Sequence, residues 1–318
     1  MSRKQNLSWV RSVAAEPDTA MAACLGSGIY NGNGLECCHP VYRAGQASGD
    51  IIGYYAIVDF NEPNIENNIV VPNNKGMHPC LTTADYPNKY NNTPKWKETP
   101  DYSNIRLIIN ANFFSLQKKP YEEKCTKALG YSYSGSQEVS GYSQVHDCDT
   151  QTLAFLKGNA ATANGPAKIV DKSAFEGFDK SNVVAAVSGF KLITNKQYND
   201  LSCGIKATHK VPRTAAGLIY KNNKATKLVI MVVNPGNRND GLTTQALATK
   251  LIDLGVTEAL NLDGGGSAQF FFKNGGTECK TLPSDERSTN LDGTCIEIPT
   301  EPKKYKCYRP YPIFLGIR

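Results

Sequence analysis

The stretch ALNLDGGGSAQFFF, residues 259–272, places one carboxylate, three glycines and a serine between two apolar runs. The aliphatic and aromatic content of each run is typical of a β-strand, so the stretch predicts two strands joined by a tight turn. Glycine adopts positive φ without strain and lets the backbone approach a ligand closely. The lone acid at the edge of this turn, Asp263, is therefore either an ordinary turn residue or part of a binding site.

Strand-like runs dominate the rest of the chain. The further segments that predict strands are IIGYYAIVDF (51–60), NIVV (68–71), IRLIINANFF (105–114), TLAFL (152–156), VVAAVSGFKLI (183–193, with a possible break at 188–189), AAGLIY (215–220) and KLVIMVV (227–233). Residues 243–255 place apolar residues at helical spacing between a threonine cap and Gly255, and they predict one helix. Residues 130–146 are rich in Tyr, Ser and Gly and predict a loop.

Many strands, few helices and no regular βαβ alternation predict an α+β fold with mixed β-sheets. We expect one domain over residues 51–318, with a cysteine-bearing insertion at 277–308. Residues 1–50 lack clear periodicity and are expected to form an irregular N-terminal segment.

Charge and hydropathy argue against several classes of protein. The net charge is +6, but lysine and arginine are spread along the chain, unlike the basic stripe of a nucleic-acid-binding protein. No segment approaches the roughly 18 apolar residues of a membrane span. Glu16, Pro17 and Asp18 interrupt any apolar core of a signal peptide, so none is visible. We expect no nucleic-acid partner and no membrane span, and the sequence does not indicate the oligomeric state.

Ten cysteines point to an oxidising environment. They include no C-x-x-C motif, and the chain has only four histidines, so the spacing of zinc ligands is absent. Scattered cysteines in even number more often form disulfides than free thiols. We therefore expect an extracellular or virion-associated protein, either exported with a leader that is later removed or released by cell lysis.

Four segments place a polar side chain where an apolar strand meets a turn of small residues: 109–114, 186–190, 212–217 and 261–267. Side chains at strand ends converge on a common rim, and ligand sites favour such rims. The four segments are therefore expected to build one site.

Three of these segments also have a purely structural explanation. Successive amides of Gly264–Gly266 can form an anion-binding nest, or the turn can be a simple hairpin. The Arg213 guanidinium can bind two phosphate oxygens, with Thr214 adding a hydroxyl, or it can form an internal ion pair. Asn110 and Asn112 share one face of a strand, where they bind either a ligand or a hydrogen-bond network of the core.

Four motifs together carry a family resemblance. INANFF (109–114), VSGFKLI (187–193), PRTAAG (212–217) and NLDGGGS (261–267), in this order, resemble the phosphodiester glycosidase family. Weaker matches are AIVDFNEPNI (56–65), the helix at 241–255, LPSDE (282–286) and RPYPIFLGI (309–317), so the resemblance runs from about residue 52 to residue 318.

The chain departs from the family pattern at several positions. Family members usually have a small residue at the place of Asn112 and a glutamate at the place of Gln245. They usually have Asp-Gly-Arg where this chain has NPGNR (234–238), so Asn234 replaces the acid and Arg238 is displaced. A Lys-Val insertion also precedes Pro212.

The resemblance implies hydrolysis of a sugar-1-phosphodiester at the anomeric carbon, giving free sugar and a phosphomonoester. An oxocarbenium-like transition state needs a carboxylate nearby, and Asp263 is the candidate stabiliser, nucleophile or base. No cofactor or metal is expected, because no cluster of His, Asp and Glu has ligand spacing. The expected catalytic group is Asp263, Arg213 and Thr214, and the expected substrate-binding group is Asn110, Asn112, Ser188, Gly189, Gly264, Gly265, Gly266, Ser267, Arg238 and His209.

Two alternatives stay open at this point. One is a binding protein for a glycan or phosphopolymer that has lost catalysis, on a virion or a cell surface. The other is a glycosidase that acts on a nucleotide-linked sugar. A nuclease or phosphatase fits less well, because no pair of metal-binding carboxylates stands out.

Overall fold

The computed structural model describes residues 30–32, 34–43, 50–63, 65–72, 104–114, 128–142, 149–158, 161, 165–201, 205–237, 239–274, 277–282, 285–287, 295–298, 304–307 and 312–318.

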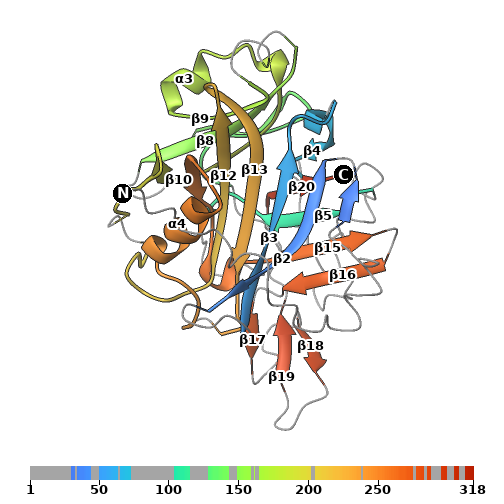
Figure 1. Cartoon of the computed structure of the whole chain (residues 1–318), viewed down its shortest axis with the longest axis vertical. Helices are drawn as coiled ribbons and strands as arrows, with labels where there is room; N and C mark the ends of the chain where they lie inside the picture. The colour runs from blue at the N-terminus through green and yellow to red at the C-terminus, as the bar shows by residue number, and fades with distance from the viewer. Residues whose placement is uncertain are drawn as a thin grey trace, which may run out of the picture.

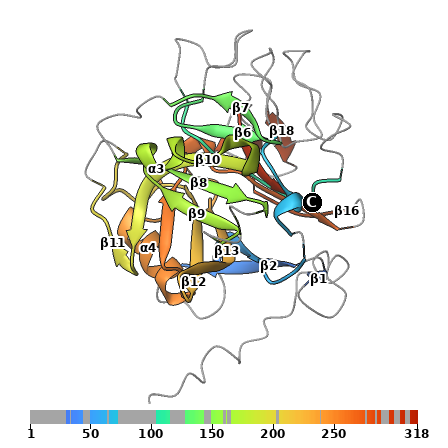
Figure 2. The same cartoon turned by 90° about the horizontal axis from the view of Figure 1, so that it is seen from above.

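The largest sheet contains twelve strands of the described chain (Figure 1). Their bounds are β1 Tyr30–Gly32, β2 Leu35–Tyr42, β3 Ile51–Asp59, β6 Ser132–Ser134, β7 Gln137–Ser140, β8 Thr150–Leu156, β9 Ala167–Val170, β10 Val183–Thr194, β11 Gln197–Tyr198, β12 Arg213–Lys221, β13 Lys224–Val233 and β14 Glu258–Asn261. The main order is β1-β2-β3-β13-β12-β14-β10-β6-β7, and β8 and β11 also pair with β10 while β9 pairs with β8. Figure 2 shows β8 and β9 alongside β10.

Two smaller sheets complete the β-structure. The second sheet contains β4 Ile69–Val70, β5 Leu107–Asn110, β15 Phe270–Asn274, β16 Thr277–Leu282 and β20 Phe314–Ile317, in the order β16-β15-β5-β20-β4. The third contains β17 Asp285–Arg287, β18 Cys295–Ile298 and β19 Lys304–Cys307, in the order β17-β19-β18, and it lies at the lower end of the molecule in Figure 1. The helical segments are α3 Lys172–Glu176, α4 Thr244–Asp253 and the 3-10 turns η2 Ile65–Asn68, η5 Lys180–Asn182 and η6 Gly265–Ser267.

The core lies between the large sheet and the second sheet. Alternate residues of each strand face this core, because side chains of a β-strand point to opposite faces in turn. Ala216 and Leu218 of β12 and Leu260 of β14 meet Phe270 and Phe272 of β15 in one buried cluster. The two sheets therefore form a single domain, and the α+β class is confirmed. Every pairing between the described strands is antiparallel, which corrects the expectation of mixed sheets; parallel pairs need long crossovers that this helix-poor chain lacks.

Helix α4 covers the other face of the large sheet, as its sequence pattern predicts. Thr243 caps the helix, its hydroxyl oxygen accepting from Ala246 N at 3.1 Å. Leu247 and Leu251 are fully buried against the sheet in a second apolar cluster. Gly255, with φ of 90°, follows the helix C-terminus, where a left-handed residue commonly ends a helix.

Two sequence expectations are wrong, and one alternative left open, the possible break at 188–189, is decided. Residues 130–146 are not all loop, because β6 and β7 form a hairpin whose turn residues Gly135 and Ser136 have φ of 58° and 65°. Strand β10 runs without a break through Ser188 and Gly189. Residues 1–50 are not irregular throughout, since β1 and β2 extend the large sheet; adjacent cysteines and a proline in β2 hide its alternation.

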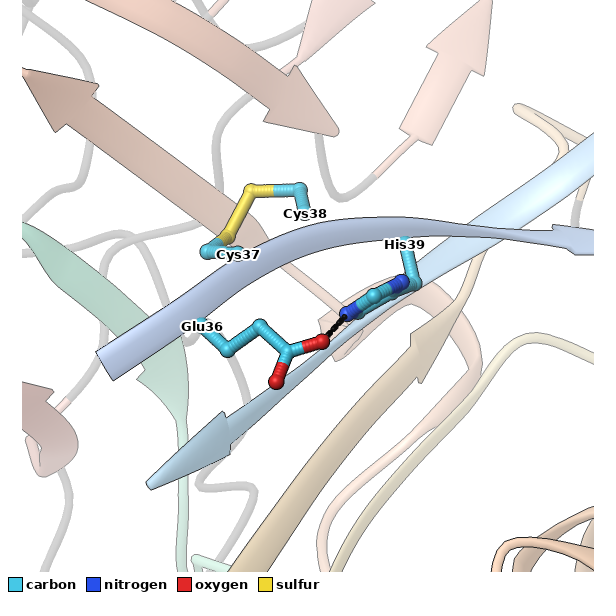
Figure 3. The surroundings of a disulfide bond; sticks show 4 residues. All are labelled: Glu36, Cys37, Cys38 and His39. Atoms are coloured by element: carbon cyan, nitrogen blue, oxygen red, sulfur yellow. Dashed lines mark ion pairs between the residues drawn. A yellow bond between two sulfur atoms is a disulfide. The ribbon is translucent and has the colours of Figure 1, made fainter. Parts of the chain in front are cut away.

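Cys37 and Cys38 form a disulfide bond within β2. The pairing of β2 with β3 shifts register between Glu36 and His39, so the two cysteines occupy an irregularity of the strand. Figure 3 shows the disulfide on one side of β2 and the Glu36–His39 pair, 2.7 Å apart, on the other. This bond confirms one disulfide. The side chains of the other cysteines lie outside the described residues, so further disulfides stay a prediction.

The helices in the described part of the chain lack the length and hydropathy that crossing a bilayer requires.

Replacing a core phenylalanine tests the packing between the two sheets. Phe272→Ala removes a fully buried ring, so we expect a loss of about 3–5 kcal/mol in the free energy of unfolding, measured by denaturant titration. The exposed Lys221→Ala serves as control and should change it by no more than about 0.5 kcal/mol. A loss below about 1 kcal/mol for Phe272→Ala contradicts the packing described.

Candidate functional site

The glycine turn crosses from one sheet to the other and is not a hairpin. It leaves β14 in the large sheet and enters β15 in the second sheet. Its backbone is bonded to both: Leu262 N donates to Thr214 O at 2.9 Å, and Asp263 N donates to Ala111 O at 3.0 Å. Asp263 therefore lies where the end of β5 and the start of β12 meet, and it stays partly exposed.

Asn110 connects the segments of this junction. It is fully buried at the end of β5. Its Nδ2 donates to Asp263 O at 2.6 Å, while its Oδ1 accepts from Thr214 Oγ1 and from Gln269 N, each at 2.9 Å. One side-chain amide thus holds the glycine turn at both ends and links it to β12. Of the two interpretations of this asparagine, the structure favours the internal network.

Asn112 has a similar place in a second network. Its Nδ2 donates to Leu129 O at 2.9 Å and to Tyr131 O at 3.2 Å, and its Oδ1 accepts from Ser188 N at 3.0 Å. The Ser188 hydroxyl donates to Tyr131 O at 2.8 Å. Both residues are buried, so they fix the segment 129–131 against β10. Their direct contact with a sugar stays a prediction, and the geometry favours a positioning role.

Arg213 lies beside the turn, with its guanidinium directed away into the protein. Gly265 N donates to Pro212 O at 2.7 Å, so the backbones of the turn and of Arg213 are neighbours. The guanidinium is buried and donates to backbone carbonyls of residues 205, 206, 209 and 242, at 2.7–3.2 Å. It therefore holds the loop at 205–209, and Thr214, whose hydroxyl binds Asn110, is likewise engaged by the protein.

Among the described residues, no acid neutralises the charge of Arg213. Desolvation by burial lowers its pKa from 12.5 to about 10, and no Asp or Glu of the described chain raises it. The group is protonated at neutral pH, with carbonyl dipoles in place of a carboxylate partner. The field of a buried cation extends beyond its own hydrogen-bond partners.

The glycine turn offers fewer amide donors than a full nest. Gly264 N donates to Oδ1 of Asp263 at 2.9 Å, and Gly265 N is bonded to Pro212 O. The expectation that three successive amides bind an anion is therefore wrong for two of them. In the described part of the chain, only the Gly266 N–H among these three has no acceptor. Gly265 has φ of 61°, which explains the need for glycine there.

The remaining predicted residues are distributed around this rim. Ser267 is buried, with its N–H donating to Gly264 O at 3.1 Å. A Cβ at Gly189 would lie 2.5 Å from Asn261 O, so glycine allows β10 and β14 to approach closely. His209 is exposed in the loop that Arg213 holds. Arg238 lies outside the described residues.

Other residues of the rim did not stand out in the sequence as site residues. Asn234 is buried, and its Nδ2 donates to Ala268 O at 2.8 Å, just after the glycine turn. Phe113 is partly exposed and packs on Phe190, with ring centroids 4.4 Å apart, giving the rim an apolar wall. Asn261 ends β14 and is buried. The signal that could have found Asn261 is the one that marked Asn110, a polar residue alternating with apolar ones in a strand.

The arrangement combines a partly exposed carboxylate and one available N–H on a single turn, and the buried charge of Arg213 lies on the neighbouring strand. It suits a ligand with a negative group and a reaction in which positive charge develops close to it. Within the described residues, no group of three or more His, Cys, Asp and Glu side chains could hold a metal ion.

Comparison with known proteins gives a family and a fold. A family model described as phosphodiester glycosidase matches residues 103–296. The catalytic domain of zebrafish N-acetylglucosamine-1-phosphodiester α-N-acetylglucosaminidase, auto-inhibited by its pro-peptide, has a TM-score of 0.57 at 17% identity, covering 91% of this chain and 84% of that one. A hypothetical protein from Synechocystis has a TM-score of 0.40 at 12% identity, covering 90% of this chain and 62% of that one. No curated protein sequence matches significantly. At these identities the structural likeness shows the fold alone.

Removing the Asn110 side chain tests its connecting role. Asn110→Ala deletes three hydrogen bonds, and at about 1 kcal/mol each we expect a loss of about 3 kcal/mol in the free energy of unfolding. Thr214→Val removes one of the three and should lose about 1 kcal/mol. Equal losses in the two variants, measured by denaturant titration, would show that Asn110 does not hold the turn.

Proposed function

Because this chain belongs to the phosphodiester glycosidase family, we propose that it hydrolyses a sugar-1-phosphodiester at the anomeric carbon. The products are the free sugar and a phosphomonoester. The observation that carries the proposal is the position of Asp263 on the same turn as the free Gly266 N–H, beside the buried Arg213. A nucleotide-linked sugar falls within the same substrate class.

The Asp263 carboxylate suits the sugar side of the breaking bond. Cleavage at the anomeric carbon passes through an oxocarbenium-like transition state, which places positive charge on the sugar ring. A fixed carboxylate stabilises that charge without reorganising during the reaction. Two hydrogen bonds hold the Asp263 backbone in place: its N–H donates to Ala111 O, and its carbonyl accepts from Asn110 Nδ2. Both partners lie at the end of β5.

The phosphate side needs donors and positive charge more than it needs a proton. A phosphomonoester is a stable anion near neutral pH, with a second pKa of about 6, so it leaves readily without protonation. The Gly266 N–H is available to a phosphate oxygen. Arg213 contributes the field of its buried charge and holds the loop that carries His209.

The buried asparagines support this site as positioning residues. Asn110 and Thr214 fix the turn, while Asn112 and Ser188 fix the segment 129–131 against β10. The partly exposed Phe113 offers an apolar surface beside them. Contacts of His209 and Arg238 with the substrate belong to the same proposal.

The substitution of Asn234 for the family's usual acid is compatible with activity. Its amide donates to Ala268 O, and its Oδ1 accepts from Gly236 N at 2.9 Å. An ionised aspartate could not make the first of these bonds, since a carboxylate only accepts. Asn234 therefore stabilises the chain after the turn, and this departure does not by itself favour a binding protein without catalysis.

The Cys37–Cys38 disulfide and the count of ten cysteines support an oxidising location for the folded protein. An extracellular or virion-associated setting fits this chemistry.

The first test is the hydrolysis of a sugar 1-(methyl phosphate), followed as free reducing sugar. Asp263→Asn keeps the size of the side chain and removes its charge, so we expect kcat to fall by about 1,000-fold or more, which corresponds to about 4 kcal/mol. The melting temperature should stay close to that of the wild type. Wild-type turnover in Asp263→Asn would remove Asp263 from the mechanism, and no turnover by the wild-type protein on any sugar-1-phosphodiester would favour a binding protein.

A second test separates the charge of Arg213 from its structural role. Arg213→Lys keeps the charge, whereas Arg213→Gln does not, and both lose carbonyl contacts. We expect kcat/KM for the phosphodiester, relative to an aryl glycoside of the same sugar, to fall about tenfold in Arg213→Gln and to change little in Arg213→Lys. An equal fall of this relative kcat/KM in Arg213→Gln and Arg213→Lys would show that the charge plays no part and that Arg213 is purely structural.

A further inference from the structure

The side-chain oxygen of Asn261 is buried without a hydrogen-bond partner. Asn261 is the last residue of β14, and only 1% of its surface is exposed. Its Nδ2 donates to Leu262 O at 2.8 Å, which fixes the orientation of the amide and leaves Oδ1 as the free acceptor. A buried acceptor without a partner costs about 1–3 kcal/mol. Such atoms are rare in folded proteins and indicate a bound water, a ligand or a catalytic role.

The position of Asn261 links this oxygen to the proposed active site. Asn261 pairs with Ala215 of β12 on one side and with Phe190 of β10 on the other. Directly paired residues of neighbouring strands share a face, so Asn261 lies on the face that α4 covers, where Ala215 and Phe190 are buried. Arg213 is on this face as well, because it lies two residues before Ala215 and its Nε donates to Leu242 O at the start of the helix region.

Asp263 follows Asn261 by two residues. Residues two apart in extended chain point to the same face, so the two side chains leave the same end of β14 on one side. A water has two O–H donors, which match the unpaired oxygen of Asn261 and one carboxylate oxygen of Asp263.

We propose that Asn261 and Asp263 together hold the water that attacks the anomeric carbon. The proposal rests on the function proposed above. One proton of the water passes to the Asp263 carboxylate as the water oxygen forms its bond to the anomeric carbon. The bond from that carbon to the phosphate oxygen breaks, and its electron pair leaves with the phosphomonoester. Asp263 then returns the proton to solvent, and a single displacement of this kind inverts the configuration of the sugar.

Substitution of Asn261 tests its contact with the water. Asn261→Ala should lower kcat by about tenfold or more and leave KM within about twofold, because the lost contact is to the water and not to the sugar-1-phosphodiester. Its melting temperature should fall by only a few degrees, because the deleted oxygen has no protein partner and the deleted Nδ2 makes one bond, to Leu262 O. Asn261→Asp keeps an acceptor and should retain more activity. The control is Asn199→Ala, whose amide is bonded to Lys191 O and Thr194 Oγ1 away from the site and which should keep full activity.

Two further measurements decide the inference. Nuclear magnetic resonance of the first product formed by the wild-type protein should show the inverted anomer, and the retained anomer overturns the proposal. A high-resolution crystal structure without substrate should show a water on Asn261 Oδ1 and Asp263, whether or not a substrate has been found. An empty position there, or unchanged kcat in Asn261→Ala, overturns the inference and leaves the proposed function standing. Absence of turnover in the wild type concerns the proposed function alone.

Discussion

The side-chain amide of Asn110 holds together the part of the molecule on which the proposed chemistry depends. The glycine turn leaves one sheet and enters another, so no continuous ladder of hydrogen bonds supports it. Asn110 replaces that ladder by binding Asp263 O, Gln269 N and the Thr214 hydroxyl from a fully buried position. Asp263 can therefore stay partly exposed while its backbone is held by the core.

In the proposed function, Arg213 acts through its buried charge and not by touching the ligand. Arg213 is surrounded by carbonyl oxygens of the loop at 205–209 and of Leu242, and these dipoles take the place of an acid. An acid at this place would neutralise the field that an anionic leaving group requires. Among the three glycine amides, the donor left for direct contact is the Gly266 N–H. Gly264 N donates to Asp263 Oδ1 and Gly265 N donates to Pro212 O.

Much of the fold could be predicted from local sequence pattern. Strand β3, the β12–β13 hairpin with positive φ at Asn222 and Asn223, and helix α4 all follow from periodicity and turn chemistry. Strand β2 and the β6–β7 hairpin could not, because cysteines, proline and serine-rich segments mask alternation. The meeting of the glycine turn with the ends of β5 and β12 was also predictable, since polar residues at strand ends converge. The hydrogen-bond partners of each polar side chain were not predictable, because those of Arg213 and Asn112 are backbone N–H and C=O groups, which nearly every residue type supplies.

The account makes one claim about bond breaking: the bond between the anomeric carbon and oxygen is cleaved, and the bond between phosphorus and oxygen is not. Hydrolysis of a sugar-1-phosphodiester in water labelled with heavy oxygen, with both products weighed by mass spectrometry, tests this claim most directly. The account predicts that the label appears in the freshly released sugar and is absent from the phosphomonoester. Label in the phosphomonoester would show attack at phosphorus, and it would contradict the role given to Asp263 and to the turn that carries it.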